Sequence, residues 1–222
     1  MAQQPQKPVR PFGALLQQAW GENPVFRQVL GICSALAVTN LVFNTALMCL
    51  GLIWATTMSS LTVSLIRNVT PRRVRIMVSV LIIAVYVIVV DICFRVLFPE
   101  VHRDIAAYVG LIVTNCIVLG RLEAFASRNR PLASVCDGLG AGLGYSLILM
   151  AVAIVRELLG FGTLLRGTPW KLTLLPTGPE SWWRPWTIMI TPPGAFFVLA
   201  IIVWAARAAA LRRPGASREA AP

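Results

Sequence analysis

Charged residues are scarce in this chain of 222 residues. Asp, Glu, Lys and Arg together make up 13% of the sequence, about half the fraction that is usual in soluble domains. Hydrophobic residues make up 57%, and the mean hydropathy is +0.72. These values argue against a soluble enzyme domain and favour a protein embedded in a membrane.

Motifs for catalysis within one chain are also missing. The sequence has no recognisable nucleophile–base pair or carboxylate dyad, and its one histidine, His102, is expected to be solvated in a loop. The glycines of "DGLGAGLGYS" (137–146) miss the GxGxxG spacing of a nucleotide-binding loop, and no strand precedes them. We interpret them as small residues that let a neighbouring membrane helix approach closely.

The cysteines lack the spacing of a metal site or a disulfide framework. No CxxC pair and no zinc-like pattern is present, which argues against a metal site built by this chain alone. A buried thiol most often serves as a small hydrophobic side chain. The five positions are Cys33, Cys49, Cys93, Cys116 and Cys136.

The net charge of +11 does not indicate nucleic acid binding. The arginines stand in short clusters between apolar runs, without a basic helix or face, as in the cytoplasmic loops of membrane proteins. The first 22 residues are polar or weakly amphipathic and lack a cleavage site after a short apolar core, so no cleavable signal peptide is expected.

Six apolar segments approach the length of about 20 residues that a membrane-spanning helix needs. They predict an all-α membrane domain over 23–212, between a segment 1–22 and a tail 213–222, with a long loop at 160–191. The predicted spans are 24–40, 42–66, 74–98, 105–121, 132–159 and 192–211.

The basic residues predict the orientation of these spans. With six spans both termini share one side, and that side collects fourteen Lys and Arg residues against four on the other, or six with Arg95 and Arg156 near helix ends. The positive-inside rule then places both termini in the cytoplasm. The fourteen are Lys7, Arg10, Arg27, Arg67, Arg72, Arg73, Arg75, Arg121, Arg128, Arg130, Arg207, Arg212, Arg213 and Arg218; the four are Arg103, Arg166, Lys171 and Arg184.

The tripeptide Val-Thr-Asn occurs twice, at 38–40 and 113–115, each time near a cysteine. Three spans in each half is an odd number, so halves of about 23–98 and 105–212 would enter the membrane from opposite sides, as inverted repeats do. We expect the first and fourth spans to be short or broken near the midplane. The polar side chains expected to bond the freed backbone groups, or a neighbouring helix, are Thr39, Asn40, Thr114 and Asn115.

Four further charged residues lie in or near the spans. Asp91 and Asp137 raise a functional hypothesis, because acids inside a membrane usually mark a site. Asp91 could instead pair with Arg95 one turn later, and Asp137 could lie near the cytoplasmic surface. Arg156 and Glu157 fall at the outer end of the fifth span, where charges are tolerated.

Several stretches together resemble the family of paired integral subunits in Rnf and Na⁺-translocating NADH:quinone reductase complexes. They are "LGICSALAVTN", "LIRNVTPRRVRI", "VGLIVTNCIVLGRLEAFA", "DGLGAGLGYSLILMAVAIVREL" and "PPGAFF", and the similarity covers about 23–212. The family more often has GRAEAFA where this chain has Leu122. "PPGAFF" and the basic tail favour the E type of Rnf subunit, while "SALAVT" and "VIVVD" resemble the D type of the quinone reductase. We take the Rnf type as the first interpretation.

The resemblance implies a [2Fe–2S] cluster at mid-membrane, held by two cysteines from this chain and two from a homologous partner of opposite topology, the Rnf A type. The family positions fall on Cys33 and Cys116; the other three cysteines match no such motif. A [2Fe–2S] centre needs four thiolates, so two from one chain require a second chain. A relay halfway across also suits a hydrocarbon core about 30 Å thick.

The resulting expectation is a subunit of a bacterial inner-membrane complex that carries flavin and further iron–sulfur centres. It would relay electrons across the membrane while the complex couples NADH and ferredoxin chemistry to Na⁺ or H⁺ movement, and it would not be catalytic alone. A secondary transporter or ion-conducting subunit and a purely structural subunit are the alternatives. The first would draw on Asp91 or Asp137; the second would tolerate loss of both cysteines.

Overall fold

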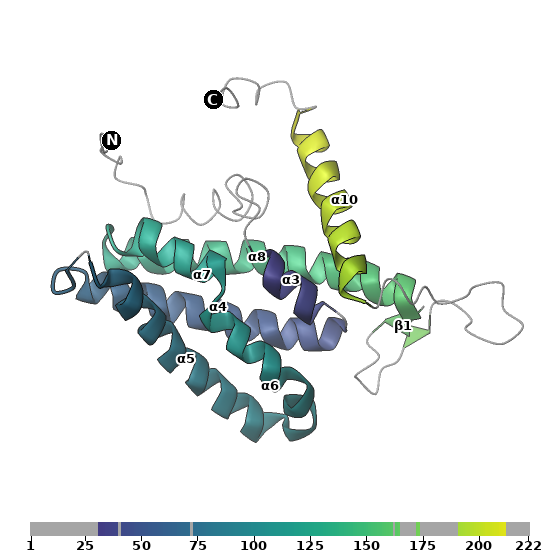
Figure 1. Ribbon diagram of the computed structural model, residues 1–222, viewed down its shortest axis with the longest axis horizontal. Helices are drawn as coiled ribbons and strands as arrows, with labels where there is room; N and C mark the ends of the chain where they lie inside the picture. Colours follow the sequence, from purple (N-terminus) through teal and green to yellow (C-terminus); the bar gives the residue numbers. More distant parts are fainter. Residues whose placement is uncertain are drawn as a thin grey trace, which may run out of the picture.

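The computed structural model describes residues 31–39, 41–71, 73–161, 163–164, 172–173 and 191–211, and these parts are almost entirely helical (Figure 1). Two strands of two residues each pair antiparallel after the longest helix. The elements are α3 (Ile32–Val38), α4 (Val42–Ile66), α5 (Arg75–Leu97), α6 (Pro99–Val113), α7 (Cys116–Arg121), the π-helix η2 (Leu122–Ala126), α8 (Pro131–Phe161), β1 (Thr163–Leu164), β2 (Leu172–Thr173) and α10 (Pro192–Leu211).

Among the described residues, four helical segments are long and apolar enough to cross a membrane. A shorter apolar helix covers Pro193–Ala205. The four are Val42–Ile66, Arg75–Leu97, Tyr108–Ala126 and Pro131–Gly160. The helical, membrane-type fold class predicted from composition is therefore confirmed, with four candidate spans in the described part of the chain.

The observed helices match four of the predicted spans closely. α4 and α10 have the predicted bounds, and α5 and α8 differ from them by one or two residues at each end. The predicted span 105–121 is instead part of α6 and α7, which are separated at Thr114 and Asn115. Of the predicted span 24–40, the described helix covers Ile32–Val38. The N-terminal segment, the tryptophans of the 160–191 loop and the C-terminal tail lie outside the described residues.

The core forms where α4 and α8 run side by side (Figure 1). The glycines of α8 allow this contact. A methyl group added at Gly142 would lie 3.3 Å from the backbone Cα of Ile53 on α4, and one added at Gly138 would lie 2.8 Å from the hydroxyl of Ser60. The glycine-rich run therefore packs one helix closely against another, as the sequence predicts.

Threonine hydroxyls inside α4 are satisfied within the helix. Thr56, Thr57 and Thr62 each donate to the carbonyl oxygen four residues earlier, at 2.6, 2.7 and 3.0 Å. A polar group in hydrocarbon must find such a partner, and a back-bonded threonine finds it in its own helix. α4 can therefore carry many polar residues in an apolar setting.

α5 and α6 form a hairpin beside this core (Figure 1). α5 exposes large apolar side chains, spaced to lie on one face, which suits contact with lipid or with another protein. These are Leu81, Val85, Ile88, Ile92 and Val96. Near the turn, Asp91 contacts the ring nitrogen Nε2 of His102 at 2.8 Å and lies 3.8 Å from Arg95. The prediction of a solvated His102 is wrong, because its side chain is only 12% exposed.

Replacing Gly142 with valine should separate α4 from α8, because the new side chain would meet the Ile53 backbone, which cannot move aside. Overpacking of this kind costs roughly 1–3 kcal/mol. We expect a lower unfolding temperature in detergent, measured by intrinsic fluorescence. The matched control is Gly110→Val on α6, where an added methyl group meets nothing within 4 Å. Equal losses in the two variants would contradict this account of the packing.

Candidate functional site

Two of the five cysteines lie in the first turn of short helices. Cys33 is the second residue of α3, which follows Gly31, and Cys116 is the first residue of α7, which follows Asn115. Near a helix start the backbone N–H groups lack partners inside the helix, and the helix dipole favours negative charge there. Both cysteines therefore lie where unpaired backbone N–H groups are available to a sulfur atom or to a group bound to it.

Gly31 joins these two helix starts. Its φ of 87° is in the left-handed region that favours glycine, and its N–H donates to Cys116 Sγ at 2.9 Å. The Cys116 thiol therefore contacts the backbone of a residue that is only two positions before Cys33. The two cysteines themselves are 83 residues apart in the sequence. Gly31 was notable in the sequence only as an interruption of an apolar run; its bond to sulfur depends on the fold.

The two cysteines are accessible from outside the chain, since Cys33 is exposed and Cys116 is partly exposed. The hydroxyl group of Tyr145 on α8 donates to the carbonyl oxygen of Gly31 at 2.7 Å, so the phenol contacts the same residue whose N–H reaches Cys116 Sγ. Cys49 is buried, and its Sγ lies 3.8 Å from the carbonyl oxygen of Ser146. The structure thus places Cys116 against Gly31, the residue two positions before Cys33, with Tyr145 bonded to the same glycine.

Asn115 holds the break between α6 and α7. Its side-chain oxygen accepts from the backbone N–H of Ile117 at 2.9 Å, which caps α7, and its side-chain nitrogen donates to Ser34 on α3 at 3.0 Å. One amide thus makes both of the bonds foreseen for the polar residues of this segment, one to a freed backbone group and one to a neighbouring helix. Thr114 ends α6 and is exposed.

The other Val-Thr-Asn copy also ends a helix. Val38 is the last residue of α3 and Thr39 caps it, while Asn40 lies outside the described residues. This break follows Cys33, whereas the break at 113–115 precedes Cys116. The tripeptide therefore marks a helix end in both places without marking the same position relative to the cysteine.

Arg156 and Glu157 clamp the connection between α3 and α4. Glu157 accepts from the backbone N–H of Val42, the first residue of α4, at 2.7 Å. Arg156 donates to the hydroxyl of Thr39 at 2.6 Å and to the carbonyl oxygen of Thr191 at 3.3 Å. Both side chains are buried, 2% and 0% exposed. They lie near the end of α8, as the sequence predicts, but there they are buried and hydrogen-bonded to the α3–α4 connection.

Asp137 forms a buried ion pair with Arg121. Both carboxylate oxygens accept from the guanidinium, in a two-pronged contact between α8 and α7. Asp137 is only 2% exposed, and its place near the cytoplasmic surface stays a prediction. Arg121 belongs to the "GRLEAFA" segment and is the last residue of α7. Its ion pair therefore attaches the end of the helix that begins at Cys116 to α8.

Within the described ranges, no group of three or more His, Cys, Asp or Glu residues could hold a metal ion. Cys33 and Cys116 provide two thiols, and one of them already accepts a backbone N–H bond, as cluster sulfurs do. Two accessible thiols at adjoining helix starts fit half of a four-thiolate iron–sulfur site.

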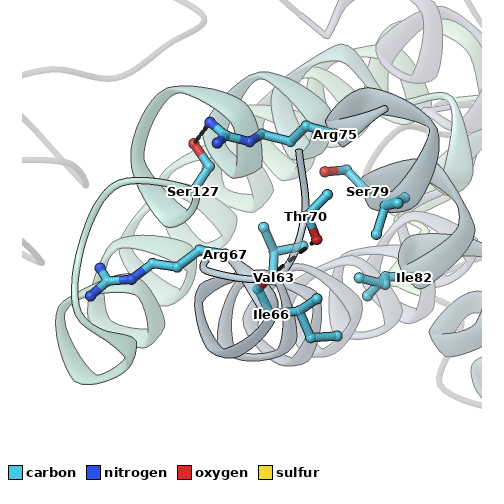
Figure 2. A pocket seen from close by; sticks show the side chains of 9 residues that line it. Val63, Ile66, Arg67, Thr70, Arg75, Ser79, Ile82 and Ser127 are labelled. Carbon is cyan, nitrogen blue, oxygen red and sulfur yellow. Dashed lines mark hydrogen bonds between the residues drawn. The ribbon is translucent and has the colours of Figure 1, made fainter. Parts of the chain in front are cut away.

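A pocket at the basic end of the bundle is separate from the cysteines. Figure 2 shows Arg75 of α5 reaching Ser127 beyond η2, where its guanidinium donates at 3.2 Å. Nearby, Ser64 donates to the carbonyl oxygen of Asn129 at 2.7 Å. These contacts attach the end of α4 and the start of α5 to the segment after η2. The lining residues are Val63, Ile66, Arg67, Thr70, Arg75, Val78, Ser79, Ile82 and Ser127.

Known proteins share most of the length of this chain. It matches the family described as "Rnf-Nqr subunit, membrane protein" over residues 12–203. It is 44% identical over 194 residues to the D-type subunit of the Na⁺-translocating NADH-quinone reductase of Aeromonas salmonicida, covering 87% of this chain and 90% of that protein. The D-type subunits of the same reductase in Psychromonas ingrahamii and Pasteurella multocida are 45% and 44% identical, over 83% and 88% of this chain and 86% and 92% of their own lengths.

These relatives help to decide between the two subunit types that the sequence motifs suggest, the Rnf E type and the D type of the quinone reductase. All three carry the name of the D type from the quinone reductase, with nearly their whole lengths covered. They favour the second interpretation over the Rnf E type. The short motifs behind the first preference, "PPGAFF" and a basic tail, are small parts of the chain, so whole-length identity outweighs them.

Proposed function

Because the chain belongs to the Rnf-Nqr family of membrane subunits, we propose that it is the D-type electron-transfer subunit of a Na⁺-translocating NADH:quinone reductase. In this proposal it relays electrons between redox carriers on the two faces of the bacterial inner membrane and is not catalytic alone. The names of its relatives support the type of complex. The cysteine geometry supports the relay.

The observation that carries the relay is the bond from the Gly31 N–H to Cys116 Sγ. It brings together two helix starts from distant parts of the chain, each bearing a cysteine that remains accessible to a partner. In the proposal Cys33 and Cys116 supply two ligands and a homologous partner supplies two more. A [2Fe–2S] group held in this way carries one electron at a time.

The residues of this chain have definite tasks in such a site. Cys33 and Cys116 bind the iron, and the Gly31 amide stabilises negative charge on one sulfur. Asn115 fixes the start of α7, so the Cys116 side chain is held in one place. Ser34, Ile117 and Tyr145 are buried and keep water from this chain's side of the site, while the partner subunit would cover the exposed side; excluding water strengthens each electrostatic contact.

The proposal extends to topology and partners. Six spans in two inverted halves would place both termini in the cytoplasm, and the partner would be a homologous protein of opposite topology. The helix starts at Ile32 and Cys116 support it, because each short helix begins at or directly before its cysteine, and discontinuous helices at matching places of two halves characterise inverted-repeat proteins. Subunits with flavin and further iron–sulfur centres would complete the complex.

The ion-conducting alternative finds less support. Its candidate acids were Asp91 and Asp137. Asp137 is engaged by Arg121 on both carboxylate oxygens, and Asp91 contacts His102 and Arg95. Neither carboxylate is presented as a vacant ion site.

Electron transfer in the assembled complex tests the proposal. We expect Cys33→Ser and Cys116→Ser each to reduce NADH-driven quinone reduction to background, because each variant removes one of the two ligands that this chain supplies. Cys49→Ser and Cys93→Ser are matched controls that should keep the rate. Each complex is purified and its subunit content verified by gel. Wild-type rates in both test variants would contradict the relay and favour a structural or transport role.

A further inference from the structure

Three buried polar side chains meet between the two cysteine-bearing helix starts. They come from separate elements: Ser34 from α3, Asn115 from the break before α7, and Tyr145 from α8. Their exposed fractions are 0%, 0% and 1%. A buried hydroxyl or amide is costly unless it is hydrogen-bonded, so the arrangement of their bonds is informative.

The bonds form a directed chain. Asn115 donates from its side-chain nitrogen to the Ser34 hydroxyl at 3.0 Å. The Ser34 and Tyr145 hydroxyls share a short hydrogen bond, and the Tyr145 hydroxyl donates to the carbonyl oxygen of Gly31 at 2.7 Å. Since Tyr145 has one hydroxyl hydrogen and gives it to Gly31, Ser34 is the donor in the shared bond. Both hydroxyl hydrogens in the chain then have one acceptor each.

This chain of hydrogen bonds is connected to Cys116 at both of its ends. Gly31, at its end, donates its N–H to Cys116 Sγ at 2.9 Å, and Cys116 is bonded through the backbone to Asn115, at its start. Asn115, Ser34, Tyr145, Gly31 and Cys116 therefore form a ring of covalent and hydrogen bonds. The ring holds in place the hydrogen bond that the Cys116 sulfur accepts.

We propose that Tyr145 and Ser34 are positioning residues that hold the Gly31 amide on Cys116 and thereby set the reduction potential of the metal group on that sulfur. The inference rests on the proposed function, since it takes Cys116 as an iron ligand. Reduction adds negative charge to an iron–sulfur group, and an N–H bond to sulfur stabilises that charge. Holding the amide in place therefore raises the potential, and releasing it lowers the potential.

The distances to the Gly31 carbonyl oxygen indicate that Tyr145 holds Gly31 in place more strongly than Ser34 does. Its hydroxyl is the near partner of the Gly31 carbonyl, at 2.7 Å, whereas the Ser34 hydroxyl lies 3.3 Å from the same oxygen. Gly31 also has no side chain to anchor it, and its left-handed φ must be held by its surroundings. Without the phenol hydroxyl, the Ser34 hydrogen can turn to the Gly31 carbonyl oxygen, but only across the longer distance of 3.3 Å.

The test is a redox titration of the purified complex followed by electron paramagnetic resonance. We expect Tyr145→Phe to keep the iron–sulfur signal and to shift the reduction equilibrium toward the oxidised form by about three- to tenfold, the size of one hydrogen bond. A tenfold change corresponds to about 59 mV for a one-electron couple. Ser34→Ala interrupts the ring at another point and should shift the equilibrium in the same direction by a smaller factor.

Tyr86→Phe is the matched control. It removes a phenol hydroxyl that bonds Thr62 between α5 and α4, at 2.7 Å and outside the ring. Its midpoint potential should equal that of the wild type. A ring that only supports the fold would lower the unfolding temperature of the Tyr145 variant while leaving the potential unchanged.

The outcomes separate the two proposals. An unshifted potential in both Tyr145→Phe and Ser34→Ala, with the signal intact, overturns the positioning role and leaves the ligands in place. Loss of the signal in both variants also overturns it, since the ring would then be needed for cluster assembly and not for tuning. If Cys116→Ser leaves every iron–sulfur signal of the complex present at its wild-type potential, the proposed function itself is overturned.

Discussion

Replacing Gly31 with alanine should separate the two cysteine-bearing helix starts. The new methyl group would lie 2.6 Å from Cδ1 of Ile117 and 2.8 Å from the ring of Tyr145, at a φ of 87° that L side chains rarely adopt. The left-handed backbone costs about 1–2 kcal/mol, and overpacking adds roughly 1–3 kcal/mol. We expect the stability to fall by several kcal/mol, measured by thermal unfolding. We also expect most of the electron paramagnetic resonance signal of the shared cluster to be lost, while the signals of other centres in the complex remain.

Two further variants test the cause. Gly120→Ala in α7 is the control, because an added methyl group there meets nothing within 4 Å. Ile117→Val removes the Cδ1 atom with which the new methyl group collides, so it should restore part of the stability lost in Gly31→Ala. Full stability in Gly31→Ala alone would contradict the tight contact at this position.

Removing the carboxylate of Glu157 is the second change with a large expected effect. The side chain is fully buried and accepts from the first N–H of α4 at 2.7 Å, where the helix dipole favours a negative charge. A hydrogen bond to a charged group contributes about 1.5–3 kcal/mol, and a buried N–H left without an acceptor costs about 1–3 kcal/mol. Glu157→Ala should therefore lower the unfolding temperature sharply and loosen the α3–α4 connection, as measured by unfolding in detergent and by proteolysis.

Two other variants serve as references for Glu157→Ala. Glu157→Gln keeps an acceptor but loses the charge, so it should be less harmful than Glu157→Ala. Arg95→Ala removes an exposed partner that lies 3.8 Å from Asp91, and exposed pairs contribute about 0–1 kcal/mol. If Glu157→Ala and Arg95→Ala lowered stability equally, the buried clamp would not hold α4.

The long helices were accessible from sequence because their apolar length alone defines them. α4 and α10 have the predicted bounds, since polar or turn-forming residues flank each apolar run. The helix break at 114–115 could also be expected from the sequence, because an Asn side chain in an apolar segment requires a hydrogen-bond partner. The importance of Cys33 and Cys116 came from family resemblance, and the structure brings their helix starts together through Gly31.

Other features depend on neighbours that are remote in the sequence. Arg156 and Glu157 look like charges at a helix end, and only the packing of α3, α4 and α10 around them makes them buried. His102 looks like a loop residue until α6 folds back onto α5 and Asp91. Tyr145 had one signal, a single phenol after a glycine-rich run, but its partners come from residues 111 and 114 positions away.

The iron content of the purified complex tests the central claim most directly. The claim is that Cys33 and Cys116 are two ligands of one [2Fe–2S] cluster shared with a homologous partner. We predict that the double variant Cys33→Ser with Cys116→Ser contains about two iron atoms fewer per complex and lacks one reduced-state resonance signal, while Cys49→Ser and Cys93→Ser keep both. An assembled double variant with unchanged iron and an unchanged spectrum would contradict the claim.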